Sequence, residues 1–163
     1  QALDSPMPAP AVDSRWAAPV LPQWGQFPQQ RELDSRYADL DATGRTSETA
    51  LMRCAEQGRS ALLRAAFAQL EAGVERTWQN LLVARVDLHL LQHRPSPARW
   101  QVGCGVTHLG RSSTVLRVAF FDDNQDCTAY ADCVLVFADR DAGKPVAMPD
   151  AVRALLDQRR VRS

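Results

Sequence analysis

The sequence has no excess of charge of either sign, because 19 lysine and arginine residues balance 19 aspartate and glutamate residues. A neutral chain has no overall field that attracts nucleic acid or an anionic membrane surface, so neither is an expected partner. The chain also lacks an apolar run near the roughly 20 residues that a membrane-spanning helix needs. Its 163 residues suit a single domain that buries about two-thirds of its unfolded surface.

Metal-binding and disulfide spacings are missing as well. No cysteine pair has the Cys-x-x-Cys spacing of a zinc site, and no histidine stands at metal-ligand spacing from another histidine or cysteine. The residues concerned are Cys54, Cys104, Cys127 and Cys133 together with His89, His93 and His108. Cys127 and Cys133 are expected on one face of one strand, too far apart to pair. We therefore expect no metal, and free thiols in a reducing cytoplasm.

Proline is scarce outside the first 30 residues, which hold six of the ten prolines. This segment shows neither helical nor alternating periodicity, which predicts a proline-rich N-terminal extension over 1–30 and a folded domain over 31–163. Trp16, Trp24 and Phe27 are spaced along the extension. Disordered tails are poor in aromatic residues, so the part from Trp16 to Phe27 is expected to dock on the domain or on a partner subunit.

The longest helical pattern follows a turn at Gly44, and Thr46 or Ser47 is placed to cap its first free amides. Small and apolar residues recur at three- and four-residue steps, which predicts one buried stripe. The stripe consists of Leu51, Cys54, Ala55, Gly58, Leu62 and Ala66. A glycine inside a helix costs about 1 kcal/mol relative to alanine, so another element is expected to pack closely against Gly58.

Alternating apolar residues predict five strands, over 32–37, 82–90, 100–106, 114–120 and 127–137. A short helix is expected to begin at Pro149. One strand, one long helix and four strands in succession are typical of an α+β fold with an antiparallel sheet.

Three motifs, in this order, resemble one known family. The first is Arg36-Tyr37-x-Asp39-x-Asp41-x-x-Gly44, followed on the helix by Glu56 and Arg59; the second is the sequence HLGRSS at 108–113; the third is LVFADR at 135–140 with Lys144-Pro145 and Met148-Pro149. Over residues 32–157 the chain resembles the 4-hydroxybenzoyl-CoA thioesterase-like branch of the hotdog superfamily. That resemblance implies a hotdog fold, in which an antiparallel sheet of about five strands wraps one long central helix.

The resemblance also implies an activity. It predicts an acyl thioesterase that hydrolyses an acyl-CoA, aroyl-CoA or acyl-carrier-protein thioester, with Asp41 as nucleophile or general base. No separate cofactor is expected, because CoA or phosphopantetheine is part of the substrate, and the assembly is expected to be a homodimer or homotetramer. A carboxylate before a helix N-terminus also lies beside free amides that can hold an oxyanion. The alternative is a purely structural role, in which Asp39 and Asp41 only cap the turn.

Two groups of residues match the family's substrate-binding positions. They are Gly44, Arg45, Thr46 and Ser47 at the helix entrance, and Gly110, Arg111, Ser112 and Ser113 at a later strand start. Arg111 either reaches a CoA phosphate or is a solvated arginine of the turn. The chain departs from the family at Arg45, where many members have histidine, and at Ser47 and Glu48. Glu48 is the weaker alternative base. These departures leave open a non-catalytic hotdog module that binds acyl thioesters or serves assembly.

Small residues on the helix are a further departure, because Leu51, Cys54 and Ala55 stand where the family has aromatic side chains. Smaller side chains would leave more room beside the helix. The sequence thus hints at a larger or longer acyl group.

Overall fold

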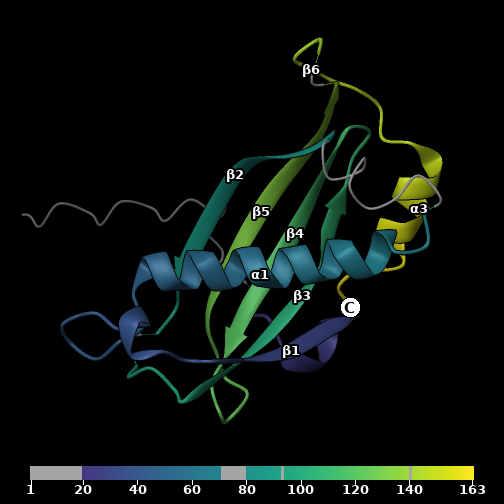
Figure 1. Cartoon of the computed structure of the whole chain (residues 1–163). Helices are drawn as coiled ribbons and strands as arrows, with labels where there is room; N and C mark the ends of the chain where they lie inside the picture. Colours follow the sequence, from purple (N-terminus) through teal and green to yellow (C-terminus); the bar gives the residue numbers. More distant parts are fainter. Residues whose placement is uncertain (1–19, 71–79, 93, 140) are drawn as a thin grey trace, which may run out of the picture.

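The computed structural model describes residues 20–70, 80–92, 94–139 and 141–163. A curled antiparallel sheet wraps one long helix, α1 (Glu48–Phe67), as Figure 1 shows. The five long strands are β1 (Gln29–Asp34), β2 (Leu81–Leu90), β3 (Arg99–Leu109), β4 (Ser113–Phe121) and β5 (Cys127–Asp139). Their spatial order is β1-β3-β4-β5-β2, and the two-residue strand β6 (Lys144–Pro145) pairs with the end of β5. This arrangement confirms the predicted α+β hotdog fold.

Helix α1 begins after Ser47, whose hydroxyl accepts a hydrogen bond from Ala50 N at 3.2 Å. The predicted stripe faces the sheet: every member is buried except Cys54, which is half-buried. A Cβ atom at Gly58 would lie 3.0 Å from Val118 Cγ1 on β4 and 3.4 Å from Val102 Cγ1 on β3. The close packing expected at Gly58 is therefore confirmed.

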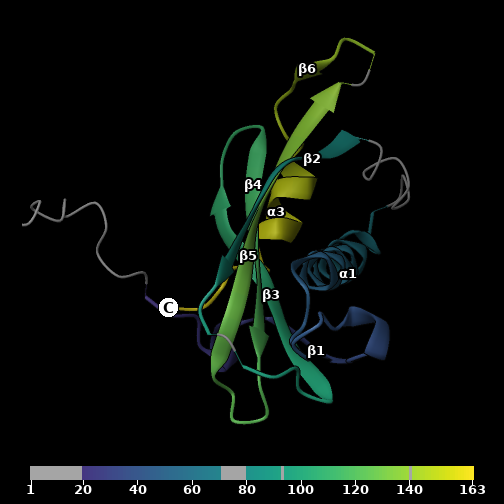
Figure 2. The ribbon, with the colours of Figure 1, turned by 90° about the vertical axis from the view of Figure 1, so that its left-hand side faces the viewer.

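Helices α1 and α3 (Asp150–Asp157) lie on one face of the sheet, and the chain termini of the described domain lie on the other (Figure 2). On that second face the 3₁₀ helix η2 (Trp24–Gln26) and the residue after it cover the sheet. The rings of Trp24 and Phe27 meet Phe121 edge to face, with centroids 5.3 and 5.9 Å apart, and Phe27 is 3% exposed. The expected docking of this aromatic segment is confirmed for Trp24 and Phe27, whereas Trp16 lies outside the described residues.

Three details differ from the sequence expectations. Strand β1 covers Gln29–Asp34 instead of residues 32–37. It ends at Asp34 because the chain then turns into the 3₁₀ helix η3 (Tyr37–Asp39), in which Asp39 accepts from Arg36 N at 3.2 Å. Pro149 precedes α3 as its N-cap and is not its first residue. The third difference concerns the placement of Cys127.

Cys127 and Cys133 lie on opposite faces of β5, which corrects the prediction that they share one. Phe120 pairs with Ala129, but the next residue of β4, Phe121, pairs with Cys127, so the register shifts. Such a bulge reverses which side chains face inward. Cys127 consequently packs with Phe27 on the outer face, and Cys133 packs in the main core.

All four cysteines are free thiols, as predicted. Within the described ranges, no group of histidine, cysteine and acidic residues has the arrangement of a metal site. None of the helices over those ranges has the length and apolar character needed to cross a bilayer.

Candidate active site

Asp41 begins the tight turn that joins η3 to α1. Its Oδ1 accepts hydrogen bonds from Thr43 Oγ1 at 2.7 Å, Thr43 N at 2.8 Å and Arg45 N at 3.1 Å. Gly44, with φ of 76°, allows the turn to close, because this region favours glycine. The bond from the Thr43 hydroxyl, followed by those from the Arg45 and Thr43 amides, lowers the pKa of Asp41 below its ordinary value. The carboxylate is therefore ionised at neutral pH.

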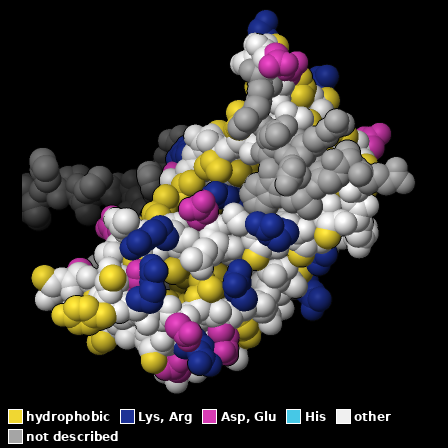
Figure 3. Space-filling view, viewed as in Figure 1, with side chains coloured by type: hydrophobic (Ala, Val, Ile, Leu, Met, Phe, Trp, Pro, Cys, Tyr) yellow, Lys and Arg dark blue, Asp and Glu magenta, His cyan; other side chains and the backbone are white. Residues whose placement is uncertain are grey.

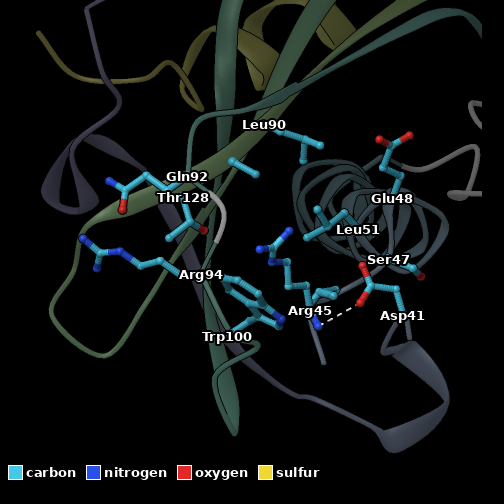
Figure 4. Close-up of a pocket in the computed structure, with 12 residues that line it drawn as sticks. Asp41, Arg45, Ser47, Glu48, Leu51, Leu90, Gln92, Arg94, Trp100 and Thr128 are labelled. Carbon is cyan, nitrogen blue, oxygen red and sulfur yellow. Dashed lines mark hydrogen bonds between the residues drawn. The ribbon is translucent and has the colours of Figure 1, made fainter. Parts of the chain in front are cut away.

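The second oxygen of Asp41, Oδ2, accepts no hydrogen bond from the described residues. The side chain is exposed and lines a pocket, and Figure 4 shows it beside Ser47 at the start of α1. One carboxylate oxygen is thus held by the turn, and the other is available to a ligand.

The N-terminus of α1 supplies hydrogen-bond donors at the same place. Ser47 N donates to Asp39 O at 2.8 Å, and the Ser47 hydroxyl accepts from Ala50 N. The amides of Glu48 and Thr49 find no acceptor in the part of the chain that the structure describes. Free amides at this end, together with the positive end of the helix dipole, favour a negative charge.

The pocket has a volume of about 190 Å³. Its lining comes from four parts of the chain: the turn and start of α1, the end of β2 with the residues after it, the start of β3 and the start of β5. The lining residues are Asp41, Arg45, Thr46, Ser47, Glu48, Leu51, Leu90, Gln92, Arg94, Trp100, Thr128 and Ala129. Most of the helix-entrance residues predicted from the sequence are therefore brought together; Gly44 shapes the turn but does not line the pocket.

Sequence reasoning missed the wall opposite the helix, which includes Leu90, Arg94, Trp100 and Thr128. Arg94 is held by Asp122 at 2.5 Å and Asp126 at 3.4 Å, both in the turn between β4 and β5. Trp100 is 6% exposed, and its indole nitrogen has no hydrogen-bond partner among the described residues. Buried tryptophan N–H groups usually find a partner. The unpaired N–H of Trp100 sets this residue apart, and it can be recognised only in the structure.

Asp39 has a different environment from Asp41. It is 5% exposed, and its carboxylate accepts from Arg36 Nη2 at 2.8 Å, Arg36 Nε at 3.0 Å and Arg53 Nη2 on α1 at 3.3 Å. The hydrogen bond from Arg36 is the main cause of a lowered Asp39 pKa. Asp39 thus ties the segment before the turn to the helix that follows it.

The second predicted group, Gly110–Ser113, forms the hairpin between β3 and β4. Gly110 N donates to Ser113 O at 2.8 Å, and Arg153 of α3 donates to the carbonyl oxygens of Gly110 and Arg111. The hairpin lies at the far end of β3 from Trp100, nine residues or roughly 30 Å along an extended strand. Within one chain it does not join the Asp41 pocket, and its substrate role stays a prediction.

No family model matches this sequence, and no curated protein sequence matches it. Solved structures do match over most of the chain. A predicted thioesterase from Bacillus stearothermophilus has a TM-score of 0.69 and 19% identity, covering 82% of this chain and 97% of its own. A thioesterase from Thermus thermophilus, solved in complex with coenzyme A and Zn, has a TM-score of 0.65 and 25% identity, covering 80% of this chain and 98% of its own.

A 1,4-dihydroxy-2-naphthoyl-CoA thioesterase from Synechocystis is also similar, with a TM-score of 0.66 and 12% identity, covering 78% of this chain and 94% of its own. At these identities the likeness establishes the fold. Unrelated activities can share a fold, so activity has to be argued from the residues of the site.

Proposed function

We propose that this chain, which has the hotdog fold of the thioesterases, hydrolyses a thioester between an acyl or aroyl group and CoA or a carrier protein. One observation carries the proposal: Asp41, whose Oδ2 accepts no hydrogen bond from the described residues, and Glu48, whose amide is unpaired among them, line one pocket. The coenzyme A bound to the Thermus thermophilus relative supports a ligand of this type.

Thioester hydrolysis needs an attacking group and a stabilised oxyanion. Attack on the carbonyl carbon moves negative charge onto the carbonyl oxygen, where backbone amides at a helix N-terminus stabilise it. The amide of Glu48, a residue that lines the pocket, is the donor proposed for that oxygen. Collapse of the tetrahedral intermediate breaks the C–S bond, and the sulfur leaves as the CoA or phosphopantetheine thiolate.

The lowered pKa of Asp41 bears on how it acts. A general base works best when its pKa lies near the working pH, whereas that of Asp41 lies below its ordinary value. We propose direct attack by Oδ2: a bond forms from Oδ2 to the carbonyl carbon, the C–S bond breaks, and water then hydrolyses the resulting acyl anhydride. Acid quenching during the first turnover, followed by mass measurement of the Asp41 peptide, should detect the acyl adduct. Thiol release without that adduct would assign Asp41 as a general base.

A second candidate function is a hotdog module that binds acyl thioesters without turnover. The three hydrogen bonds to Asp41 Oδ1 favour it, because they give the carboxylate a role in the turn that requires no catalysis. Thiol release from a panel of acyl-CoA and acyl-carrier-protein thioesters separates the two functions. Hydrolysis by the parent and its loss in Asp41→Asn are expected; tight binding without thiol release would establish the binding module.

The proposed assembly is a homodimer at least, with the tetramer as the larger alternative. Strand β2 is an edge of the sheet, and its Leu82, Val83 and Leu90 are 38%, 46% and 41% exposed. Figure 3 shows the hydrophobic side chains gathered in a band over this edge. An unpaired apolar edge strand favours pairing with another chain. Leu90 also lines the pocket, so a partner at this edge would border the site.

A further inference from the structure

Trp100, the second residue of β3, is one of the buried residues that line the Asp41 pocket. Its ring packs edge to face on Phe120, with centroids 6.1 Å apart and an interplanar angle of 76°. Phe120 is fully buried and does not reach the pocket. The space beyond the Trp100 ring is consequently filled by the main core.

The other buried walls are Leu51 on α1 and Ala129 on β5, at 4% and 2% exposure. The pocket lining also includes the exposed, charged residues Asp41 and Glu48. A thioester whose carbonyl lies at Asp41 would place its acyl group against the buried, apolar walls. Its CoA or carrier portion would remain toward solvent.

Only one of the three small helix residues noted in the sequence, Leu51, lines the pocket. Cys54 and Ala55 do not line the pocket, and Ala55 is 1% exposed against the core. The missing aromatic bulk on the helix is replaced from β3 by Trp100, which shares the main core cluster with Leu51 and Ala55.

The volume sets the scale of the acyl group. A cavity of about 150 Å³ can hold benzene, so the pocket's 190 Å³ is of the size that holds a single aromatic ring. The same space can hold a short aliphatic chain of about six heavy atoms. A twelve-carbon acyl chain would contact the Trp100 ring before the whole chain lay inside the pocket.

We propose that Trp100 sets the acyl-size limit, so that the substrates are thioesters of compact acyl groups and long-chain thioesters are rejected. This inference rests on the proposed function, because it assigns the Asp41 pocket to the acyl group. Trp100 is a specificity-determining residue that touches the acyl group and takes no part in bond making.

The test measures kcat/KM for butanoyl-, hexanoyl-, octanoyl-, dodecanoyl- and benzoyl-CoA. One methylene in a closed hydrophobic pocket changes kcat/KM by about tenfold or more. The parent should lose at least that factor between hexanoyl- and dodecanoyl-CoA. Trp100→Ala opens the way to Phe120 and should raise the dodecanoyl-to-hexanoyl ratio at least about tenfold, and Trp100→Phe should raise it less. A parent that accepts dodecanoyl-CoA equally well, or a Trp100→Ala profile that matches the parent's, overturns the proposal.

A matched control separates the size limit from loss of stability. Phe67 is fully buried near the end of α1, away from the pocket. Phe67→Leu should lower the melting temperature yet leave the ratio of long to short thioesters at the parental value. A changed ratio of long to short thioesters in Phe67→Leu would mean that general loosening of the fold, and not the loss of the Trp100 ring, alters the size limit. If Trp100→Ala does not fold, Trp100→Leu and Trp100→Phe decide the result.

Binding separates this proposal from the proposed function. Non-hydrolysable acyl-CoA thioethers of the same chain lengths are titrated into the parent and Trp100→Ala by calorimetry. If the parent releases no thiol from any thioester, hydrolysis is wrong, but the same size limit in binding would support the role of Trp100. Equal affinity of the parent for butyl and dodecyl thioethers would overturn the size limit even where hydrolysis occurs.

Discussion

Asp39 and Asp41 are two residues apart, yet their carboxylates face different surroundings. Asp39 is buried between Arg36 and Arg53, whereas Asp41 is exposed and lines the pocket. Leu40, between them, is extended after η3, with φ of −85° and ψ of 145°. One carboxylate therefore holds the segment to α1, and the other is presented to a ligand.

Asp41→Asn should lower kcat by about 10²-fold or more, the usual scale for loss of a positioned catalytic acid or base. KM should change little, because the asparagine oxygen can still accept from the Thr43 and Arg45 amides. Steady-state thiol release at matched melting temperatures measures both constants. Parental turnover by a normally folded Asp41→Asn would contradict the assignment and favour the binding module.

Glu48→Gln is the control for Asp41, because Glu48 lines the same pocket in the first turn of α1. Loss of its charge removes a favourable helix-dipole interaction and should leave kcat within a few-fold of the parent. A loss near 10²-fold in Glu48→Gln, with an active Asp41→Asn, would move the chemistry to the helix.

Asp39→Asn should act on stability. It weakens charge-assisted hydrogen bonds from two arginines. Because these arginines are 62% and 51% exposed, solvent screens the interaction, and the free energy of unfolding should fall by only about 1–2 kcal/mol. That cost corresponds to a melting temperature lower by roughly 2–8 °C for a chain of this size. Turnover per folded molecule should remain near the parental value. A large fall in kcat without a change in melting temperature would mean that Asp39 acts in the reaction.

The acid side of the stability profile should also depend on Asp39. Because Arg36 lowers its pKa in the folded state, the folded chain binds fewer protons than the unfolded chain at this site. The stabilisation is present above the unfolded pKa of about 3.9 and is lost as the pH falls through the folded pKa. The stability difference between the parent and Asp39→Asn should thus shrink below about pH 4, as measured by denaturant unfolding. A difference that stays constant down to about pH 2 would exclude this linkage.

Gly58 substitutions should show a graded response. Gly58→Ala places a methyl group 3.0 Å from Val118 Cγ1, so crowding opposes the gain of about 1 kcal/mol in helix propensity. Gly58→Leu cannot be accommodated by a small shift and should cost about 1–3 kcal/mol or more. Urea unfolding measures both variants. A leucine variant as stable as the parent would mean that this face of α1 does not pack on the sheet.

The proposed dimer predicts a concentration-independent dimer in sedimentation velocity at micromolar protein. Val83→Lys places a charge on the exposed apolar edge of β2 and should shift the population toward monomer. Lys144 is exposed and lies on the short strand β6, which pairs with the end of β5 and is not part of β2, so Lys144→Glu should leave the dimer intact. A parent that sediments as a stable monomer would contradict both the dimer and a partner at the pocket.

Local patterns were enough to predict the elements and one side of the site. The 3.6-residue stripe of α1 marked its buried face, including Gly58, and Ser47, Gly44 and Asp41 have the residue types that a capped turn requires. These features depend on neighbours within a few residues along the chain. Sequence periodicity therefore carries them directly.

The sequence by itself determined the central helix, the strands and the turn that presents Asp41. Only the tertiary structure decided that Trp100 and Thr128 face that turn, because the order β3-β4-β5-β2 brings distant strand ends to one place. It also placed Gly110–Ser113 at the opposite end of β3, and a one-residue bulge turned Cys127 to the outer face. Strand periodicity tells which residues share a face, but sheet order and register decide which strand ends and faces meet.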